Sequence, residues 1–159
     1  MHYRVGPGSV AVLLIALAGC TASDVVLDRA PPGYVEDVAA RAGTVDWSRA
    51  ATVIVDLSEF EFEPGSLVFR TEVPYRLVLR NSGHSRHTFV SDGFFKAIAA
   101  HRLISAEGEV ANPYIKVIGV PPGETKELQF IALRKGAYPL ACTIFLHEAF
   151  GMDGEIAVQ

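Results

Sequence analysis

The segment Cys142-Thr-Ile-Phe-Leu-His147-Glu-Ala-Phe-Gly-Met152-Asp-Gly154 places three different metal-binding side chains close together near the end of the chain. Four residues separate the thiol from the imidazole, and four separate the imidazole from the thioether. Thiolate and thioether favour Cu(I), imidazole suits both copper oxidation states, and a trigonal His₂Cys site with a weak axial Met is the blue-copper geometry. The segment therefore predicts a mononuclear copper site, Cu(I)/Cu(II), that needs one more histidine.

The spacing of these ligands indicates a loop rather than a helix. Residues five positions apart do not share a helix face. We expect Cys142 to end a strand and the following chain to turn back, so that His147 and Met152 point toward the sulfur. Gly151 and Gly154 permit the tight backbone that such a turn requires.

Three histidines upstream are candidates for the second imidazole ligand: His84, His87 and His101. His87 begins a predicted strand after a turn, and a ligand is best held on a rigid element. We therefore favour His87, with His84 in the turn as the alternative. His101 is interpreted as a polar residue on a helix.

The remaining chain predicts an all-β domain. Short β-rich runs are separated by Gly and Pro turns, which is typical of a sandwich or barrel. The expected strands cover 52–57, 60–62, 66–70, 75–80, 86–91, 114–120, 127–130, 137–142 and 155–158. Residues 94–104 have near-helical apolar spacing, so we expect one short helix inserted there.

The copper-ligand segment resembles the metal-binding loop of the cupredoxins, the blue copper proteins. The run Phe60-x-Phe62-x-Pro64-Gly65 is similar to the opening strand of many exported members, and the resemblance covers about residues 52–159. It implies a Greek-key β-sandwich with copper near one end. It also implies a monomeric one-electron carrier, not an enzyme, that exchanges electrons with a redox protein such as a cytochrome or oxidase.

The resemblance also implies roles for two residues beside the ligands. Many cupredoxins have Asn after the first histidine, and its side chain bonds across to the ligand loop; this chain has Thr88 there. Thr143, after the cysteine, matches a common residue type. We therefore expect Thr88 and Thr143 to support the ligands.

Apolar residues flank the ligands within the loop. Phe145, Leu146 and Phe150 are expected to exclude water from the metal, and burial is one influence on the redox potential. In the cupredoxins the histidine of the ligand loop often reaches the surface and passes the electron. By this resemblance, we expect His147 with Phe145 and Leu146 to form the surface that docks the redox partner.

The N-terminus is predicted to be an export signal. Arg4 precedes the apolar run 10–18, which is too short to span a bilayer. The end of that run, Leu17-Ala18-Gly19-Cys20, resembles the lipobox of bacterial lipoproteins. We therefore expect a signal peptide over residues 1–19, a lipid on Cys20 and an extracytoplasmic (periplasmic) location on a bacterial membrane. Thr21 after the cysteine favours an outer membrane.

Residues 20–50 are interpreted as a tether to the copper-binding domain, residues 51–159. A coil of this length would reach roughly 30 Å. Residues 34–42 are expected to form a short helix that ends before Gly43.

The cysteine and methionine counts support the copper interpretation. The chain has two Cys and two Met. If Cys20 carries lipid and Met1 is removed, Cys142 and Met152 are the only thiol and thioether left. A free thiol in an exported protein needs an explanation, and metal ligation provides one.

Composition restricts the other function classes. The net charge is -4, and no basic cluster suggests nucleic acid as a partner. A copper-delivery or copper-tolerance protein is the alternative, although such proteins often carry several Met and His ligands. Copper nitrite reductases, whose domains resemble cupredoxins, need two such domains, and this chain is too short. Zinc does not usually take a thioether ligand.

Overall fold

A computed structural model describes residues 24–159. Its strands are, in chain order, β1 (Val25–Leu27), β2 (Ala51–Ser58), β3 (Glu61–Glu63), β4 (Ser66–Phe69), β5 (Pro74–Asn81), β6 (His87–Phe89), β7 (Ile98–Ser105), β8 (Gly108–Ala111), β9 (Tyr114–Val120), β10 (Thr125–Ala132), β11 (Gly136–Ala141) and β12 (Asp153–Val158). The helices are α1 (Val38–Gly43) and α2 (Asp92–Ala97), with 3₁₀ turns η1 (Trp47–Arg49) and η2 (Glu148–Phe150).

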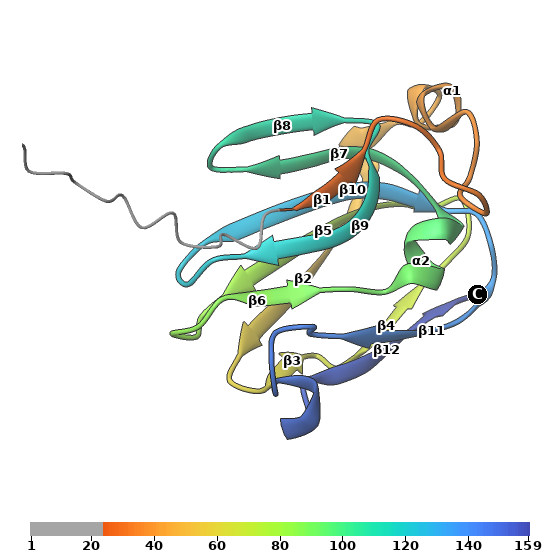
Figure 1. Cartoon of the computed structure of the whole chain (residues 1–159). Coiled ribbons are helices and arrows are strands. Elements are labelled where there is room, and N and C mark those ends of the chain that lie inside the picture. Colours follow the sequence, from red (N-terminus) through yellow and green to blue (C-terminus); the bar gives the residue numbers. More distant parts are fainter. Residues whose placement is uncertain (1–23) are drawn as a thin grey trace, which may run out of the picture.

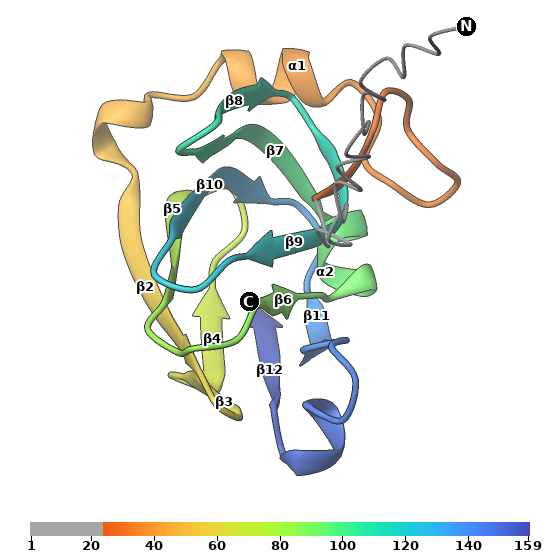
Figure 2. The same cartoon turned by 60° about the vertical axis from the view of Figure 1, so that its left-hand side comes forward.

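The strands form two facing layers, as Figures 1 and 2 show. One layer is a six-stranded sheet in the order β3-β2-β5-β10-β7-β8. The other combines two three-stranded sheets, β1-β9-β6 and β11-β12-β4. An antiparallel bridge between Val90 and Ala141 connects these two sheets, with N–H···O distances of 3.1 and 3.0 Å. This is the predicted β-sandwich with little helix.

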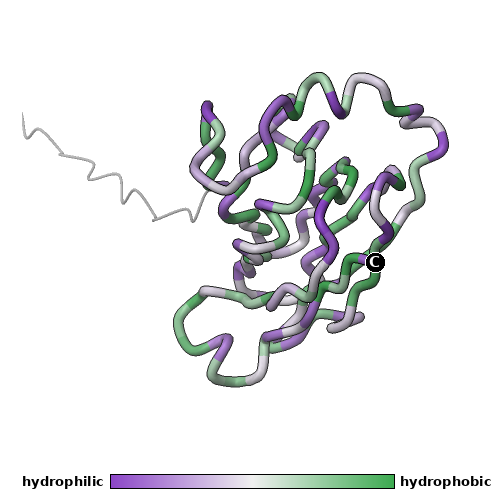
Figure 3. The backbone as a smooth tube through the Cα atoms, turned by 90° about the vertical axis from the view of Figure 1, so that its right-hand side faces the viewer, coloured by the Kyte–Doolittle hydropathy of each residue, from purple (hydrophilic) through white to green (hydrophobic). Residues whose placement is uncertain are grey.

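Alternating side chains place the core between the layers. In β5 every second residue, Tyr75, Leu77 and Leu79, is buried, while the residues between them are more exposed. Green and purple stretches accordingly alternate along much of the tube in Figure 3. Phe69 and Phe130 meet edge to face at 5.0 Å in the centre of this core.

The helix expected over residues 94–104 is only partly correct. α2 ends at Ala97, and the chain then continues as β7, which pairs with β10 on one side and β8 on the other. Cross-strand packing decides this segment, because Ile98, Ala100 and Leu103 are buried against neighbours that local periodicity does not reveal. His101 therefore lies on a strand rather than a helix, and its ring stacks on Trp47 at 4.5 Å.

Residues 24–50 are ordered on the sandwich, so the reach of a flexible coil does not apply to them. β1 pairs with β9, and Tyr34 is buried and donates a hydrogen bond to the Ile115 carbonyl at 2.6 Å. α1, shorter than the expected 34–42 helix, packs Val38 against Ala99. The predicted signal peptide, Cys20 and Thr21 lie outside the described residues. Within residues 24–159, no helix has the length and apolar character needed to cross a membrane.

Candidate metal centre

Three neighbouring elements at one end of the sandwich bring the predicted ligands together. His87 is the first residue of β6, and Cys142 directly follows β11. The bridge between Val90 and Ala141 fixes these two strands side by side. Met152 directly precedes β12, so the ligand loop begins and ends on paired strands.

The donor atoms of His87, Cys142 and His147 converge on one point. The two Nδ1 atoms are 3.2 Å apart, and the Cys142 sulfur is 3.7 Å from His147 Nδ1. All three ligand atoms lie within 4.8 Å of one another. His87 and Cys142 are fully buried, and His147 is 8% exposed. These residues form the one cluster of three or more His, Cys, Asp or Glu side chains suited to a metal within residues 24–159.

Met152 is held by the backbone of the same loop. Its carbonyl accepts a hydrogen bond from Cys142 N at 3.1 Å, and its N–H donates to the His147 carbonyl at 3.0 Å. The side chain is fully buried. The turn before it depends on Gly151, which has φ 99°, in the region that favours glycine. Gly154 is required for a different reason, because a Cβ there would collide with the Gly65 carbonyl oxygen.

Thr88 connects the first histidine strand to the cysteine. Its backbone N–H lies 3.4 Å from the Cys142 sulfur and its hydroxyl 3.6 Å. The same hydroxyl accepts a hydrogen bond from Thr143 N at 2.8 Å. Thr88 thus makes the bond across to the ligand loop that Asn makes in many cupredoxins, and hydrogen bonds to a ligand sulfur are one influence on its redox potential.

His84 and His101 lie away from this cluster. The His84 side chain is fully exposed in the loop before β6. His101 lies on β7 under the Trp47 ring, where its Nδ1 is buried without a hydrogen-bond partner. Of the three histidine candidates, only His87 meets Cys142 and His147.

Burial shapes the charge of the first histidine. It lowers the pKa of His87, the neighbouring His147 lowers it further, and Glu59 opposes the change. A neutral imidazole is the form that binds metal. The pKa of Glu59 is lowered because its carboxylate accepts hydrogen bonds from Ser85 N and His84 N. No local pattern points to Glu59, since these partners are more than twenty positions away.

Apolar side chains surround the ligands at the surface. Phe145 is 84% exposed, Phe150 61% and Leu146 48%. Phe60 lies edge to face against His147, with ring centroids 5.0 Å apart, and also contacts Phe150. The expected shielding by Phe145, Leu146 and Phe150 is therefore wrong in detail. These side chains form an exposed rim, while Phe60 packs against the histidine.

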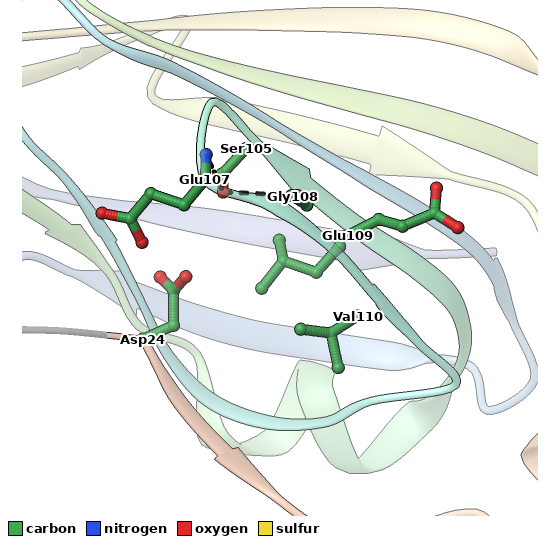
Figure 4. A pocket seen from close by; sticks show the side chains of 7 residues that line it. Asp24, Ser105, Glu107, Gly108, Glu109 and Val110 are labelled. Atoms are coloured by element: carbon green, nitrogen blue, oxygen red, sulfur yellow. Dashed lines mark hydrogen bonds between the residues drawn. The ribbon is translucent and has the colours of Figure 1, made fainter.

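Away from the His87 cluster, a group of acidic side chains lines a pocket beside the β7–β8 hairpin (Figure 4). Its carboxylates do not converge: the side chains of Glu107 and Glu109 point away from each other, and Glu109 pairs with Arg102 at 3.2 Å. Asp24 instead binds Lys126 at 2.7 Å. This pocket therefore lacks the ligand arrangement of the His87 cluster.

The donor separations fit one copper ion. We take the metal–nitrogen and metal–thiolate bond lengths found in zinc sites. In a trigonal site with these bonds, two nitrogens lie about 3.5 Å apart, and a nitrogen lies about 3.8 Å from the sulfur. The 3.2 Å and 3.7 Å separations here are close to those values. The residues present therefore suit a His₂Cys site with Met152 adjacent.

No family model and no curated protein matches the chain. Solved structures do match. Auracyanin B aligns with a TM-score of 0.50 and 20% identity over 72% of this chain and 93% of that one. The fold is that of the cupredoxins. A multicopper oxidase from Campylobacter jejuni aligns with a TM-score of 0.57 and 20% identity, over 72% of this chain and 31% of the oxidase.

A copper nitrite reductase from Nitrosomonas europaea shares the same cupredoxin fold. It aligns with a TM-score of 0.51 and 13% identity, over 72% of this chain and 50% of the reductase. This chain thus spans about a third of the oxidase and half of the reductase. At these identities the similarity establishes the fold alone.

Proposed function

We propose that this chain is a one-electron carrier that uses a single copper ion held by His87, Cys142, His147 and Met152. The observation that carries the proposal is the buried convergence of two imidazoles and a thiolate on strand ends. A bound copper ion would supply the Cu(I)/Cu(II) couple. The surrounding strands fix the ligands, so a change of redox state requires little movement of the protein.

This arrangement favours electron transfer over copper delivery. A copper-delivery protein must release its metal to a partner. Release is easier when the ligands are exposed and lie on a flexible segment. Here the cysteine and methionine are fully buried. Among the four ligands, only His147 approaches the surface, where an electron can pass without the metal leaving.

The carrier role also fits better than an oxidase or reductase role. The oxidase and reductase that share the fold are much longer chains. Residues 24–159 contain one His/Cys cluster of the required kind. A further catalytic copper would need a second set of ligands.

Redox cycling separates the carrier from the delivery protein. The purified chain loaded with one copper should be reduced and reoxidised repeatedly in the presence of a Cu(I) chelator and keep its metal. Loss of the copper to the chelator at the first reduction would favour delivery and contradict the carrier proposal.

The docking surface for a redox partner is proposed to be the exposed rim around His147, formed by Phe60, Phe145, Leu146 and Phe150. Leu146→Lys should slow electron exchange with the physiological partner, because a charge replaces an apolar contact. Val68→Lys is a matched control, since Val68 is also apolar and exposed but lies on β4. Equal exchange rates for both variants would place the docking surface elsewhere.

We also propose that the chain is exported and held on a bacterial membrane through lipid on Cys20. Asp24 is attached to the sandwich through Lys126 and Gly119. Four residues of chain reach at most about 14 Å. A lipid on Cys20 would therefore keep the domain beside the bilayer. Cys20→Ala should release the protein into the soluble fraction, and unchanged membrane attachment would count against the lipid.

A further inference from the structure

One carboxylate lies behind the first histidine of the metal centre. Glu59 is in the turn between β2 and β3, and its Oε1 is 3.8 Å from His87 Nε2. That nitrogen is buried and has no hydrogen-bond partner in the structure. The carboxylate is therefore the charged group that the structure places beside this nitrogen.

The orientation of the His87 ring decides which of its nitrogens can bind a metal and which can donate to Glu59. Nδ1 faces His147 Nδ1 at 3.2 Å and thus points into the metal cluster. The proton of a neutral imidazole that uses Nδ1 as a ligand must be on Nε2. Metal-bound histidines usually donate this second N–H to a carboxylate or carbonyl, which fixes the ring and makes the ligand more basic.

The structure holds the Glu59 carboxylate at this position from two sides. Oε1 accepts hydrogen bonds from His84 N at 2.7 Å and Ser85 N at 2.8 Å. Gly83 leaves the space that the carboxylate occupies, because a Cβ there would lie 2.7 Å from Glu59 Oε2. The loop before His87 is therefore built around this side chain.

We propose that Glu59 is the positioning residue for His87, accepting the Nε2 proton and holding the ring so that Nδ1 points at the copper. A movement of about 1 Å brings the two atoms to hydrogen-bond distance. Phe60, the next residue, packs on His147. The Glu59–Phe60 turn thus contacts both histidine ligands, one from behind and one from the side.

This inference rests on the proposed copper function. It predicts that the Glu59–Phe60 turn lowers the redox potential of the copper. A carboxylate behind an imidazole ligand favours the more highly charged metal ion. Replacing it by a neutral amide should weaken Cu(II) binding about tenfold, within the range seen for such outer partners. With Cu(I) binding unchanged, a tenfold loss raises the one-electron potential by about 59 mV.

The test compares Glu59→Gln with Glu61→Gln in the copper-loaded chain, by redox titration. Glu61 is a matched control, because it carries the same charge two residues further along and contacts Ser58 instead of a ligand. Glu59→Gln should raise the potential while Glu61→Gln leaves it nearly unchanged. Equal shifts in the two variants would overturn the proposal.

A second measurement needs neither a variant nor copper. Nitrogen NMR of the metal-free wild-type chain should show His87 as the Nε2–H tautomer. An Nδ1–H tautomer would overturn the role of Glu59 even if the variants fail to fold. If the wild-type chain does not form a coloured copper complex, the proposed function fails, whereas the tautomer still tests the contact between Glu59 and His87.

Discussion

At the scale of single residues, the candidate ligands come from two parts of the chain: His87 begins β6, and the other three lie in the loop between β11 and β12. The spacing of Cys142, His147 and Met152 is local and therefore visible. His87 lies on a distant strand, so the sequence alone kept His84 as an alternative ligand. The register of that strand places His87 in the cluster. Glu59 had no local signature, because its partners are set only by the pairing of distant loops.

Thr88 gives the first prediction at this scale. Thr88→Val keeps the shape but removes the hydroxyl that accepts the Thr143 N–H. Thr143 is exposed, so water can partly replace the lost acceptor, and a hydrogen bond of this kind contributes about 0.5–1.5 kcal/mol. The free energy of unfolding should fall by about this amount in urea titrations. The copper absorption band should also shift, since a hydrogen bond to the sulfur is lost.

The control for this change is Thr52→Val, on an exposed position of β2. It should leave both stability and spectrum nearly unchanged. Equal behaviour of the two variants would show that the Thr88 hydroxyl does not support the ligand loop.

At the scale of elements, alternating side chains and turn residues predicted most of the strands. They did not predict the strand that follows α2. β5, β9 and β10 have clear alternating or β-rich patterns. β7 contains small residues, Ala99 and Ala100, that fit a strand only because β10 packs alongside. β1 is too short to be recognised without its partner β9.

The attachment of β1 gives a prediction at this scale. Lys126 is 6% exposed and its ammonium binds Asp24 at 2.7 Å. The pair is only partly buried, because Asp24 is 23% exposed, so loss of one partner should cost between the values for exposed and buried pairs, about 1–3 kcal/mol. Asp24→Ala should therefore lower the free energy of unfolding by about this amount, as measured by urea titration.

The comparison variant is Glu109→Ala, which breaks the exposed pair with Arg102. Surface pairs contribute about 0–1 kcal/mol, so this variant should unfold nearly as the wild type does. If Asp24→Ala is as mild as Glu109→Ala, the N-terminal segment does not depend on this ion pair.

At the scale of the whole molecule, pH should affect stability through His101. Burial lowers its pKa from 6.5 in the folded chain, with Arg102 lowering it further. The unfolded chain therefore binds a proton first as the pH falls below about 6.5. The stability that His101 contributes is present above this pH and is lost below it.

The experiment compares the metal-free wild-type chain with His101→Phe, whose ring retains the stacking on Trp47. Urea unfolding between about pH 7.5 and 5 should show a steeper loss of free energy in the wild type, by at most about 1.4 kcal/mol per pH unit. Parallel curves would contradict the assignment of this titration to His101.

At this scale, paired strands also hold both ends of the ligand loop of the candidate metal centre. The ligand loop begins after β11 and ends at β12, which pair along their whole length, and His87 begins a strand that continues into the bridge to the same sheet. A site built this way holds its geometry before any metal binds. The protein should therefore take up copper without refolding.

Addition of Cu(II) to the purified chain tests this account most directly. One equivalent should give an intense blue or green absorption from thiolate-to-copper charge transfer, and Cys142→Ser should abolish it. A wild-type chain that binds copper without colour would contradict the ligand set of His87, Cys142, His147 and Met152.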